Sequence, residues 1–246
     1  MRRFTAAIVV AASAAVVAAC GGGNHGGPSS SATTTTSTKP PIAQPALAGL
    51  LLTPAEIDTL FGVTGTKSKV TVDKLQDDVA KQATGPGAVK LPDECDYILG
   101  PAEAPVYANS GNTAVSGDDD TTSLGNDQDV EVGQALVLFP SAKEASDFFN
   151  ASAQRWPACA SRQIDQPATA DGPESSWKVG PFANSNGTLS VTPSVSIGGP
   201  TPMTISAQRA LTVRNNVIVD VVAVRKDPAD FAVKVANQIA DKVAKQ

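Results

Sequence analysis

The chain has 246 residues, with 19 Lys or Arg against 24 Asp or Glu, and its formal net charge at neutral pH is −5. A negative balance disfavours nucleic acids and anionic membrane surfaces as partners. His25 is the only histidine and lies among glycines near the N-terminus, so the rest of the chain cannot use Ser-His-Asp catalysis, Cys-His catalysis or a histidine-ligated zinc ion.

Residues 1–19 have the pattern of a lipoprotein signal peptide. A basic start precedes an apolar run over 5–19, whose 15 residues fall short of the roughly 20 needed to span a bilayer as a helix. The run ends in Val17-Ala18-Ala19-Cys20. This sequence resembles the lipobox of bacterial lipoproteins, in which the cysteine receives acyl chains such as palmitate and becomes the first mature residue. An ordinary cleaved signal peptide with an incidental cysteine is the alternative.

Lipidation at Cys20 would hold the mature chain on the extracytoplasmic face of the cell membrane, since two or more acyl chains anchor a protein stably. Loss of Arg2 and Arg3 leaves 17 basic against 24 acidic residues, a net charge of −7. Residues 20–45 are rich in Gly, Ser, Thr and Pro and predict a disordered tether. The folded domain is expected over 46–246.

The first predicted helix begins after Thr53. Thr53 and Glu56 have capping-box spacing, Pro54 suits the first helical position, and Gly62 can adopt the left-handed conformation that ends a helix. Residues 72–83 are compatible with a second, short helix.

Short extended pieces are expected next, at 91–101, 106–107 and 113–115, because Gly and Pro divide them. Residues 117–129 predict a solvated polar loop with five carboxylates: Asp118, Asp119, Asp120, Asp127 and Asp129. The spacing of an EF-hand is absent from this loop, so no metal is expected. The apolar segment 130–139 predicts a strand.

Residues 141–160 predict an amphipathic helix. Ser141 and Glu144 form a capping box, and Pro157 cannot continue the helix. Apolar and small side chains recur at helical spacing and form one stripe: Ala145, Phe148, Phe149, Ser152, Ala153 and Trp156. Cys159 follows the end of this helix.

Cys95 and Cys159 remain as an even pair once Cys20 is assigned to lipid. A disulfide between them is expected in an exported protein, with two free thiols as the alternative.

The C-terminal part predicts strands at 176–182, 188–197, 203–214 and 217–225. Asn186-Gly187 and Asn215-Asn216 are hairpin signals, which imply antiparallel pairing. Asp227-Pro228 predicts the start of a last helix. The fold class is therefore α+β, a mainly antiparallel sheet with helices packed on it and one disulfide.

The chain from about 47 to 246 resembles the extracellular sensor domain of the mycobacterial serine/threonine kinase PknH, a domain also found alone in mycobacterial lipoproteins. The resemblance is carried in order by LLLTPAEIDTLFG at 50–62, Glu94-Cys95, GPAEAPVYANS at 100–110, QALVLFPSA at 134–142 and WPAC at 156–159. It implies an antiparallel sheet with helices, a cleft for an unknown ligand and a family disulfide at Cys95 and Cys159. The second family disulfide has no counterpart after Cys159. Kinase motifs are missing from these residues, so the kinase activity is not carried over.

A non-enzymatic function is expected, with no catalytic residue, cofactor or metal. A carboxylate pair such as Asp93 or Glu94 with Asp96 is the remaining catalytic alternative, but adjacent loop acids are usually solvated. The leading hypothesis is an envelope lipoprotein that binds an unknown small-molecule, lipid or cell-wall ligand in a cleft. Candidate cleft residues are Tyr97, Tyr107 and Trp177, with Trp156 a fourth aromatic, and core packing is the alternative role for each. The competing hypothesis is a structural or protein-interaction lipoprotein that binds an envelope protein.

The anchor is testable by replacing Cys20 with Ser. Without an acylated thiol the chain should move from the membrane pellet to the soluble fraction of its host, as measured by fractionation and immunoblotting. A Cys20→Ser protein that still sediments with lipid would show that the anchor lies elsewhere.

Overall fold

An antiparallel sheet organises the computed structural model, which describes residues 39–77, 91–123, 129–170 and 172–246. The described strands follow the spatial order β1-β2-β3-β10-β9-β8-β5-β4, with β7 paired to β9 and β6 paired to β7. Their bounds are β1 Lys67–Val72, β2 Ala114–Thr122, β3 Val130–Leu138, β4 Gln163–Gln166, β5 Ser175–Val179, β6 Ala183–Ser185, β7 Thr188–Val191, β8 Pro193–Ile197, β9 Met203–Arg214 and β10 Val217–Val224. The pairings between these strands are antiparallel, as predicted.

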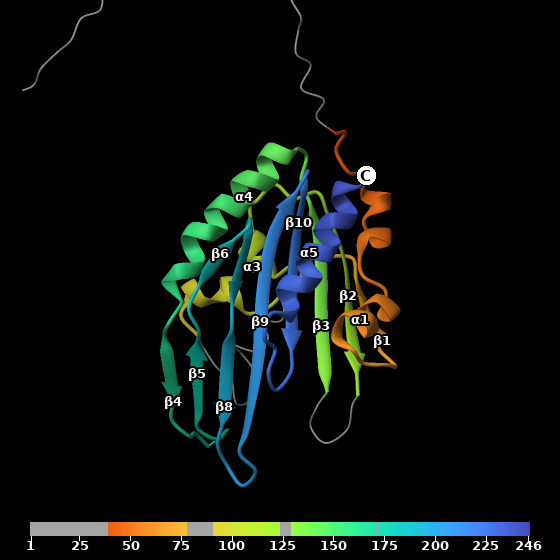
Figure 1. Cartoon of the computed structure of the whole chain (residues 1–246). Helices are drawn as coiled ribbons and strands as arrows, with labels where there is room; N and C mark the ends of the chain where they lie inside the picture. Colours follow the sequence, from red (N-terminus) through yellow and green to blue (C-terminus); the bar gives the residue numbers. More distant parts are fainter. Residues whose placement is uncertain (1–38, 78–90, 124–128, 171) are drawn as a thin grey trace, which may run out of the picture. The chain divides into compact units, whose positions relative to one another are not determined.

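The long strand β9 connects the two halves of the sheet. Its C-terminal half pairs with β7 and its N-terminal half pairs with β8. β7 and β8 pair with β9 in the same register, so together they form the predicted strand at 188–197. The strand is interrupted at Thr192, whose carbonyl accepts a hydrogen bond from the Gly180 N–H. β4, β5 and β8 extend beyond the ends of the helices (Figure 1).

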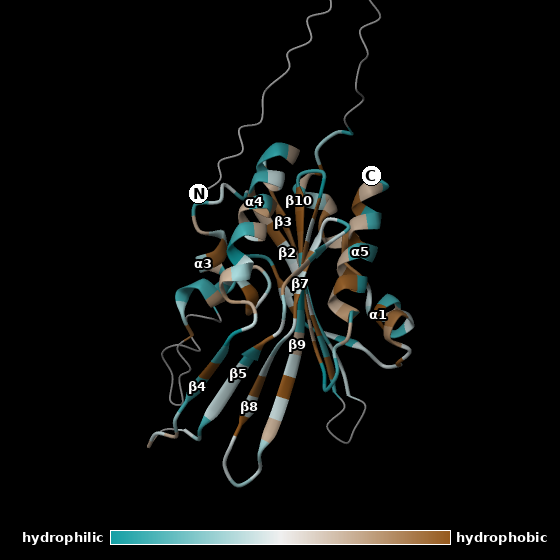
Figure 2. Cartoon of the chain, turned by 60° about the vertical axis from the view of Figure 1, so that its left-hand side comes forward, coloured by the Kyte–Doolittle hydropathy of each residue, from teal (hydrophilic) through white to brown (hydrophobic). Residues whose placement is uncertain are grey.

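Helices cover both faces of the sheet (Figure 2). One face carries η1 Gln44–Ala46, η2 Ala48–Leu50, α1 Pro54–Phe61 and α5 Phe231–Ala244, and the other carries η3 Asp93–Ile98, α3 Ala104–Tyr107, α4 Ala142–Arg155 and η4 Trp156–Ala158. The α+β prediction is therefore confirmed.

Alternating side chains of the central strands supply an apolar core on each face. The α5 face contains Val130, Val132, Leu136, Leu138, Val217, Val219, Val221, Val235, Ile239 and Val243. The α4 face contains Ala135, Val137, Ile218, Phe148, Phe149 and Trp156. Because both faces are covered, β3 and β10 are apolar at nearly every position.

The capping signals predict the first helices correctly. In α1, Thr53 Oγ1 accepts from the Glu56 N–H at 3.3 Å, Glu56 Oε2 accepts from the Thr53 N–H at 2.8 Å, and Gly62 ends the helix at φ +66°. In α4, Ser141 Oγ accepts from the Glu144 N–H at 3.3 Å. The chain then tightens into η4 at Pro157, and the predicted stripe is buried except for the half-buried Ala153.

Other local predictions are wrong. Residues 67–72 form β1, and 73–77 are not helical; the rest of the proposed helix at 72–83 lies outside the described residues. The expected extended pieces contain the helical turns η3 and α3. Asp118, Asp119 and Asp120 belong to β2 rather than to a solvated loop, Asp129 accepts from the Ser123 hydroxyl, and Asp127 is outside the described part.

The last helix begins later than Asp227-Pro228 predicts. Asp227 Oδ1 accepts from the Ala229 N–H at 3.2 Å, and Ala229 has a φ of +42°. This turn holds Pro228 outside the helix, which begins at Phe231. Asp227 therefore acts as a turn residue rather than as the helix cap.

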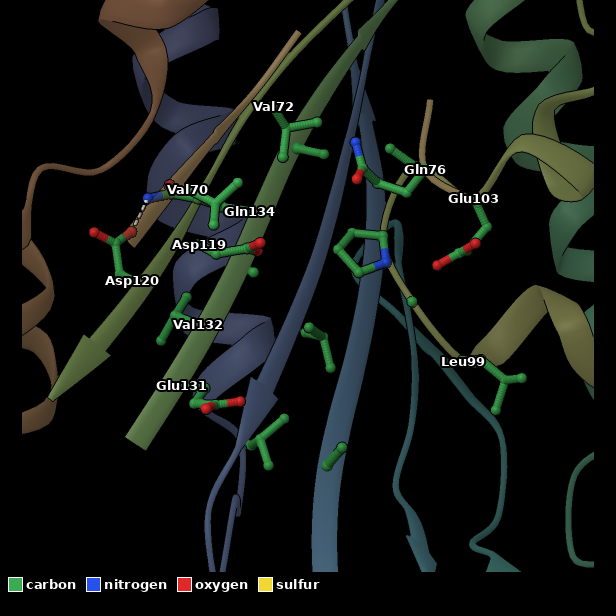
Figure 3. Close-up of a pocket in the computed structure, with 18 of the residues that line it drawn as sticks. Val70, Val72, Gln76, Leu99, Glu103, Asp119, Asp120, Glu131, Val132 and Gln134 are labelled. Atoms are coloured by element: carbon green, nitrogen blue, oxygen red, sulfur yellow. Dashed lines mark hydrogen bonds between the residues drawn. The ribbon is translucent and has the colours of Figure 1, made fainter. Parts of the chain in front are cut away.

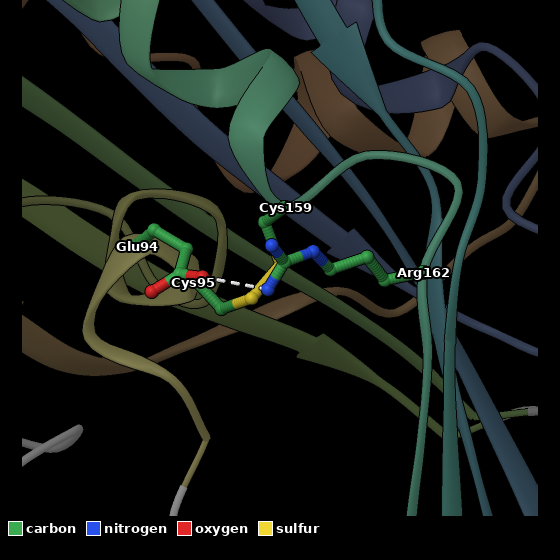
Figure 4. Close-up of a disulfide and its surroundings, with 4 residues drawn as sticks. All are labelled: Glu94, Cys95, Cys159 and Arg162. Atoms are coloured by element: carbon green, nitrogen blue, oxygen red, sulfur yellow. Dashed lines mark hydrogen bonds and ion pairs between the residues drawn. A yellow bond between two sulfur atoms is a disulfide. The ribbon is translucent and has the colours of Figure 1, made fainter.

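The expected disulfide between Cys95 and Cys159 is present and fully buried. It joins η3 to the end of α4 across a sequence separation of 64, which on the chain-entropy model stabilises the fold by about 4 kcal/mol. Beside it, Arg162 Nη1 and Glu94 Oε1 form an ion pair at 2.6 Å (Figure 4). This pair is half-exposed, so its contribution to stability is small.

Two buried amide side chains fix the N-terminal segment to the sheet. Asn216 accepts from the Ile42 N–H at 2.7 Å and donates to the Ile42 carbonyl at 3.1 Å. Gln134 makes the same pair of bonds with Leu52, at 2.8 Å each. Packing thus starts within the range 20–45 predicted as tether, since residues 39–45 belong to the described unit and Ile42 is buried.

Candidate functional site

A groove of about 420 Å³ opens on the face of the sheet that carries α3 and α4. Strands β1, β2, β3, β10 and β9 provide its floor, residues 99–103 provide one wall, and β5 and β8 contribute Trp177, Pro193, Ser194 and Val195. Its size falls within the range typical of small-ligand sites. Figure 3 shows the lining side chains.

One cross-strand row forms the centre of the floor. Val70, Asp119, Gly133 and Val222 lie opposite one another on β1, β2, β3 and β10. A Cβ atom on Gly133 would lie 3.1 Å from Asp119 Oδ1 and 3.2 Å from Pro101 Cγ. The missing side chain therefore allows the Asp119 carboxylate and the wall to approach the sheet closely.

The next row on the same face mixes apolar and acidic groups. Thr121, Glu131 and Val224 are opposite one another, and Ala207 pairs with Val224. Toward the far end of β9 the lining includes Ile205. The floor is thus apolar with carboxylates at intervals.

A buried ion pair holds the wall in place. Arg209 Nη2 lies 2.5 Å from Asp220 Oδ1, and both side chains are 1% exposed. Arg209 also donates to the carbonyls of Val221 and Gly100, at 2.5 and 2.9 Å. Asp220 Oδ2 accepts from the Ala102 N–H at 2.9 Å, so both partners bind wall backbone as well as each other.

Tyr107 completes this network. Its hydroxyl donates to Asp220 Oδ2 at 2.9 Å, and its ring stacks on Phe148 at a centroid distance of 4.5 Å. Burial, followed by the negative charge of Asp220, raises the pKa of Tyr107 well above its usual value. The hydroxyl is therefore a proton donor at physiological pH. Gln76, which also lines the groove, exchanges backbone hydrogen bonds with Ala102 and Ala104 at 2.8 and 2.7 Å.

Asp120 occupies the opposite face of β2. Its Oδ2 accepts from Gln134 Nε2 at 2.8 Å, its Oδ1 has no hydrogen-bond partner, and the residue is 1% exposed. Burial raises the pKa of Asp120 to about 6, the Gln134 hydrogen bond opposes this rise, and repulsion from Asp118 and Asp119 adds to it. A titratable group thus lies beneath the acidic part of the groove.

Of the predicted cleft residues, Trp177 alone lines this groove. It is half-buried, and its indole Nε1 has no hydrogen-bond partner. Tyr107 is buried beneath the wall, and Tyr97 lies half-buried against the Arg155 guanidinium, 5.1 Å from its ring centroid. Trp156 belongs to the core.

The other candidate residues lie away from the groove. Asp93, Glu94 and Asp96 are on η3, where Glu94 pairs with Arg162 and burial raises the pKa of Asp96. Cys20 lies outside the described residues. Asp119, Glu131, Arg209 and Asp220 are not identified from the sequence as residues of the groove or its wall. The clearest sequence signal for this site is the charged Asp220 within the apolar strand VIVDVVAV.

Comparison with known proteins identifies relatives of the domain. A family model described as "PknH-like extracellular domain" matches residues 42–242. The serine/threonine-protein kinases PknH of Mycobacterium bovis and Mycobacterium tuberculosis are each 30% identical over 208 residues, which are 84% of this chain and 32% and 30% of theirs. The chain therefore spans about a third of the length of these curated relatives.

A solved structure extends the comparison to the fold. The crystal structure of the extracellular domain of PknH from Mycobacterium tuberculosis matches 84% of this chain and 99% of its own, with a TM-score of 0.68 and 28% identity. In the described part of the chain, no helix is long and apolar enough to cross a membrane.

The raised pKa of Asp120 predicts a pH-dependent stability. The folded state binds this proton more tightly than the unfolded chain, so the free energy of unfolding should fall as pH rises from about 4 to about 6, by about 2 kcal/mol. Asp120→Asn should lose this part of the decline, as measured by urea unfolding at a series of pH values. Parallel profiles for the two proteins would mean that Asp120 titrates normally.

Proposed function

The chain belongs to the PknH-like extracellular domain family, and from that premise we propose that it is a membrane-anchored lipoprotein of the cell envelope that binds a ligand in the groove without catalysing a reaction. The family implies an extracytoplasmic location for the domain. The lipid anchor at Cys20 and the ligand are the proposed parts.

The observation that carries this proposal is the apolar surface left exposed at the groove. Among the described residues, the exposed large apolar side chains are Val70, Met203 and Ile205, with exposed fractions of 48%, 51% and 37%. Val70 and Ile205 both line the groove, from its two sides. Exposed apolar side chains in a preformed concave site are typical of ligand binding.

The position of the N-terminal segment fits a tethered binding domain. Ile42 is held by Asn216, at the turn between β9 and β10. The groove lies toward the other end of β10, at Val222 and Val224. Eight residues of strand separate the two ends, about 26 Å at 3.3 Å per residue. A ligand could therefore enter the groove at the end remote from the attachment segment.

The kinase activity named for the relatives is not part of the proposal. The matched region is the extracellular domain of PknH, and the motifs that bind ATP and magnesium in protein kinases are missing from this sequence. The domain would therefore bind its ligand without phosphoryl transfer of its own.

A second candidate function is binding of an envelope protein. A wider hollow of about 670 Å³ lies on β4, β5, β8 and the start of β9, with Met203 in its lining. These strands extend past the helices, so a protein partner could contact them directly (Figure 1).

Replacing the exposed apolar side chains by serine should distinguish ligand binding in the groove from protein binding at the second hollow. We expect native mass spectrometry of the chain isolated from its own host to show a copurified small molecule. Val70→Ser with Ile205→Ser should reduce the occupied fraction at least about tenfold, since each lost apolar contact costs about 1 kcal/mol. Neither side chain is buried, so the thermal midpoint should be retained.

Met203→Ser is the matched control, because it removes an equally exposed apolar side chain outside the groove. The proposal fails if the double variant keeps the ligand. If Met203→Ser instead releases a copurified protein, binding of a protein at the second hollow is favoured.

A further inference from the structure

Resting on the proposed function, we infer that the ligand is an amphiphile whose acyl or alkyl chain lies across strands β10, β9, β8 and β5. The class of ligand follows from an uncharged apolar strip of the sheet, from the polar side chains on its reverse face and from the size of the strip.

The apolar strip crosses the part of the sheet remote from β1. It is formed by two cross-strand rows on one face, with Ile164, Trp177, Val195 and Ile205 in the first and Pro193, Ala207 and Val224 in the second. Among the described groove-lining residues on β5, β8, β9 and β10, none is charged. The charged lining residues belong to the other strands and to the wall. An apolar chain on the strip would therefore have its polar end toward β1, β2 and β3.

The reverse face of the same strands is polar. Asp165, Ser176, Ser196 and Thr204 lie opposite one another on β4, β5, β8 and β9. The Ser176 hydroxyl donates to Asp165 Oδ1 at 2.6 Å, and the hydroxyls of Ser196 and Thr204 are hydrogen-bonded at 3.0 Å. Such alternation is typical of a sheet with one solvated face and one covered face.

The apolar strip is only partly covered in the structure. Ile205 is 37% exposed, and Ile164, Trp177 and Val195 are half-buried. Leu99, on the wall, lines the same groove (Figure 3). A hydrocarbon chain in the groove would contact apolar side chains of both strip and wall, and would remove them from water.

The dimensions of the strip favour a single chain over a protein partner. Strands β10, β9, β8, β5 and β4 are consecutive neighbours, so the strip is about 19 Å long at a spacing of about 4.8 Å per strand. This length is close to the roughly 15 Å that one leaflet of lipid chains spans in a bilayer. Two rows cover an area on the order of 250 Å², well below the roughly 800 Å² that each partner buries in a standard protein interface.

A series of uncharged amphiphiles that differ only in chain length tests this inference. Hexyl, octyl, decyl and dodecyl maltoside would be titrated, below their micelle concentrations, into the full mature chain carrying Cys20→Ser, with maltose as the control for the sugar. Each added pair of methylenes should tighten binding about fourfold, about half of the gain for complete burial. The amide signals of Val195 and Val224 and the indole N–H signal of Trp177 should shift in NMR spectra, whereas the indole signal of the buried Trp156 should not.

Polar substitutions within the strip identify the side chains responsible. Val195→Thr and Ile205→Thr keep a β-branched side chain suited to a strand, and each should weaken dodecyl maltoside binding about fivefold because a hydroxyl replaces an apolar contact. Ile205 is exposed, so its variant tests the inference even if Val195→Thr impairs folding. Thr204→Val is the matched control, since it makes the reverse exchange on the polar face and should leave binding unchanged.

Binding that does not tighten with chain length, an unmoved Trp177 signal, or insensitivity of dodecyl maltoside to both strip variants would overturn the inference. The proposed function is judged separately, by whether the Val70 and Ile205 variant loses the ligand copurified from the host. Loss of that ligand together with a flat chain-length series would retain the groove as a binding site and reject the acyl chain.

Discussion

The buried ion pair between Arg209 and Asp220 is the interaction on which the groove depends. Transfer of two charges into an apolar sheet is costly, and the cost is offset only when the remaining polar atoms are hydrogen-bonded. Here the partners include the carbonyl of Gly100, the N–H of Ala102 and the hydroxyl of Tyr107. The wall segment therefore completes the ion pair, and displacement of the wall would leave buried charge unsatisfied.

The disulfide constrains the same segment from its other end. The disulfide joins Cys95 on η3 to Cys159, which follows η4. Cys95 lies only a few residues before the wall segment 99–103. Trp156, in the same turn as Cys159, lies with its ring centroid 5.9 Å from the Arg209 guanidinium. Covalent and electrostatic constraints thus hold one short segment against the sheet. A wall fixed in this way favours binding to a preformed site over closure around the ligand.

Local signals in the sequence are sufficient for much of the fold. The Thr53 and Ser141 caps and the Asn186-Gly187 hairpin are formed by residues that are close in the sequence, and the two cysteines that follow Cys20 pair with each other. The edge strand β1 was missed because its side chains are mostly exposed, which leaves no alternation to detect. Asp118 to Asp120 resemble a loop because three consecutive carboxylates are typical of solvated segments, although pairing to β1 and β3 makes them a strand and Asp120 is buried.

The groove could not be derived from the sequence, because its floor is assembled from strands distant along the chain. Asp119, Gly133 and Val222 become neighbours only through register. The polar neighbours of Trp177 in the sequence predict its partial exposure, and in the structure it lines the groove. Tyr107 is a cleft candidate because aromatic residues are scarce in the sequence, whereas in the structure its hydroxyl donates to the buried Asp220 beneath the wall.

Amide hydrogen exchange at Ala102 tests most directly whether the ion pair fixes the wall. The Ala102 N–H donates to Asp220 Oδ2, so it should open only when the β9–β10 pair opens, and its protection should match that of the β10 amides. Exchange of Ala102 at the rate of an unstructured peptide, while β10 stays protected, would contradict the account.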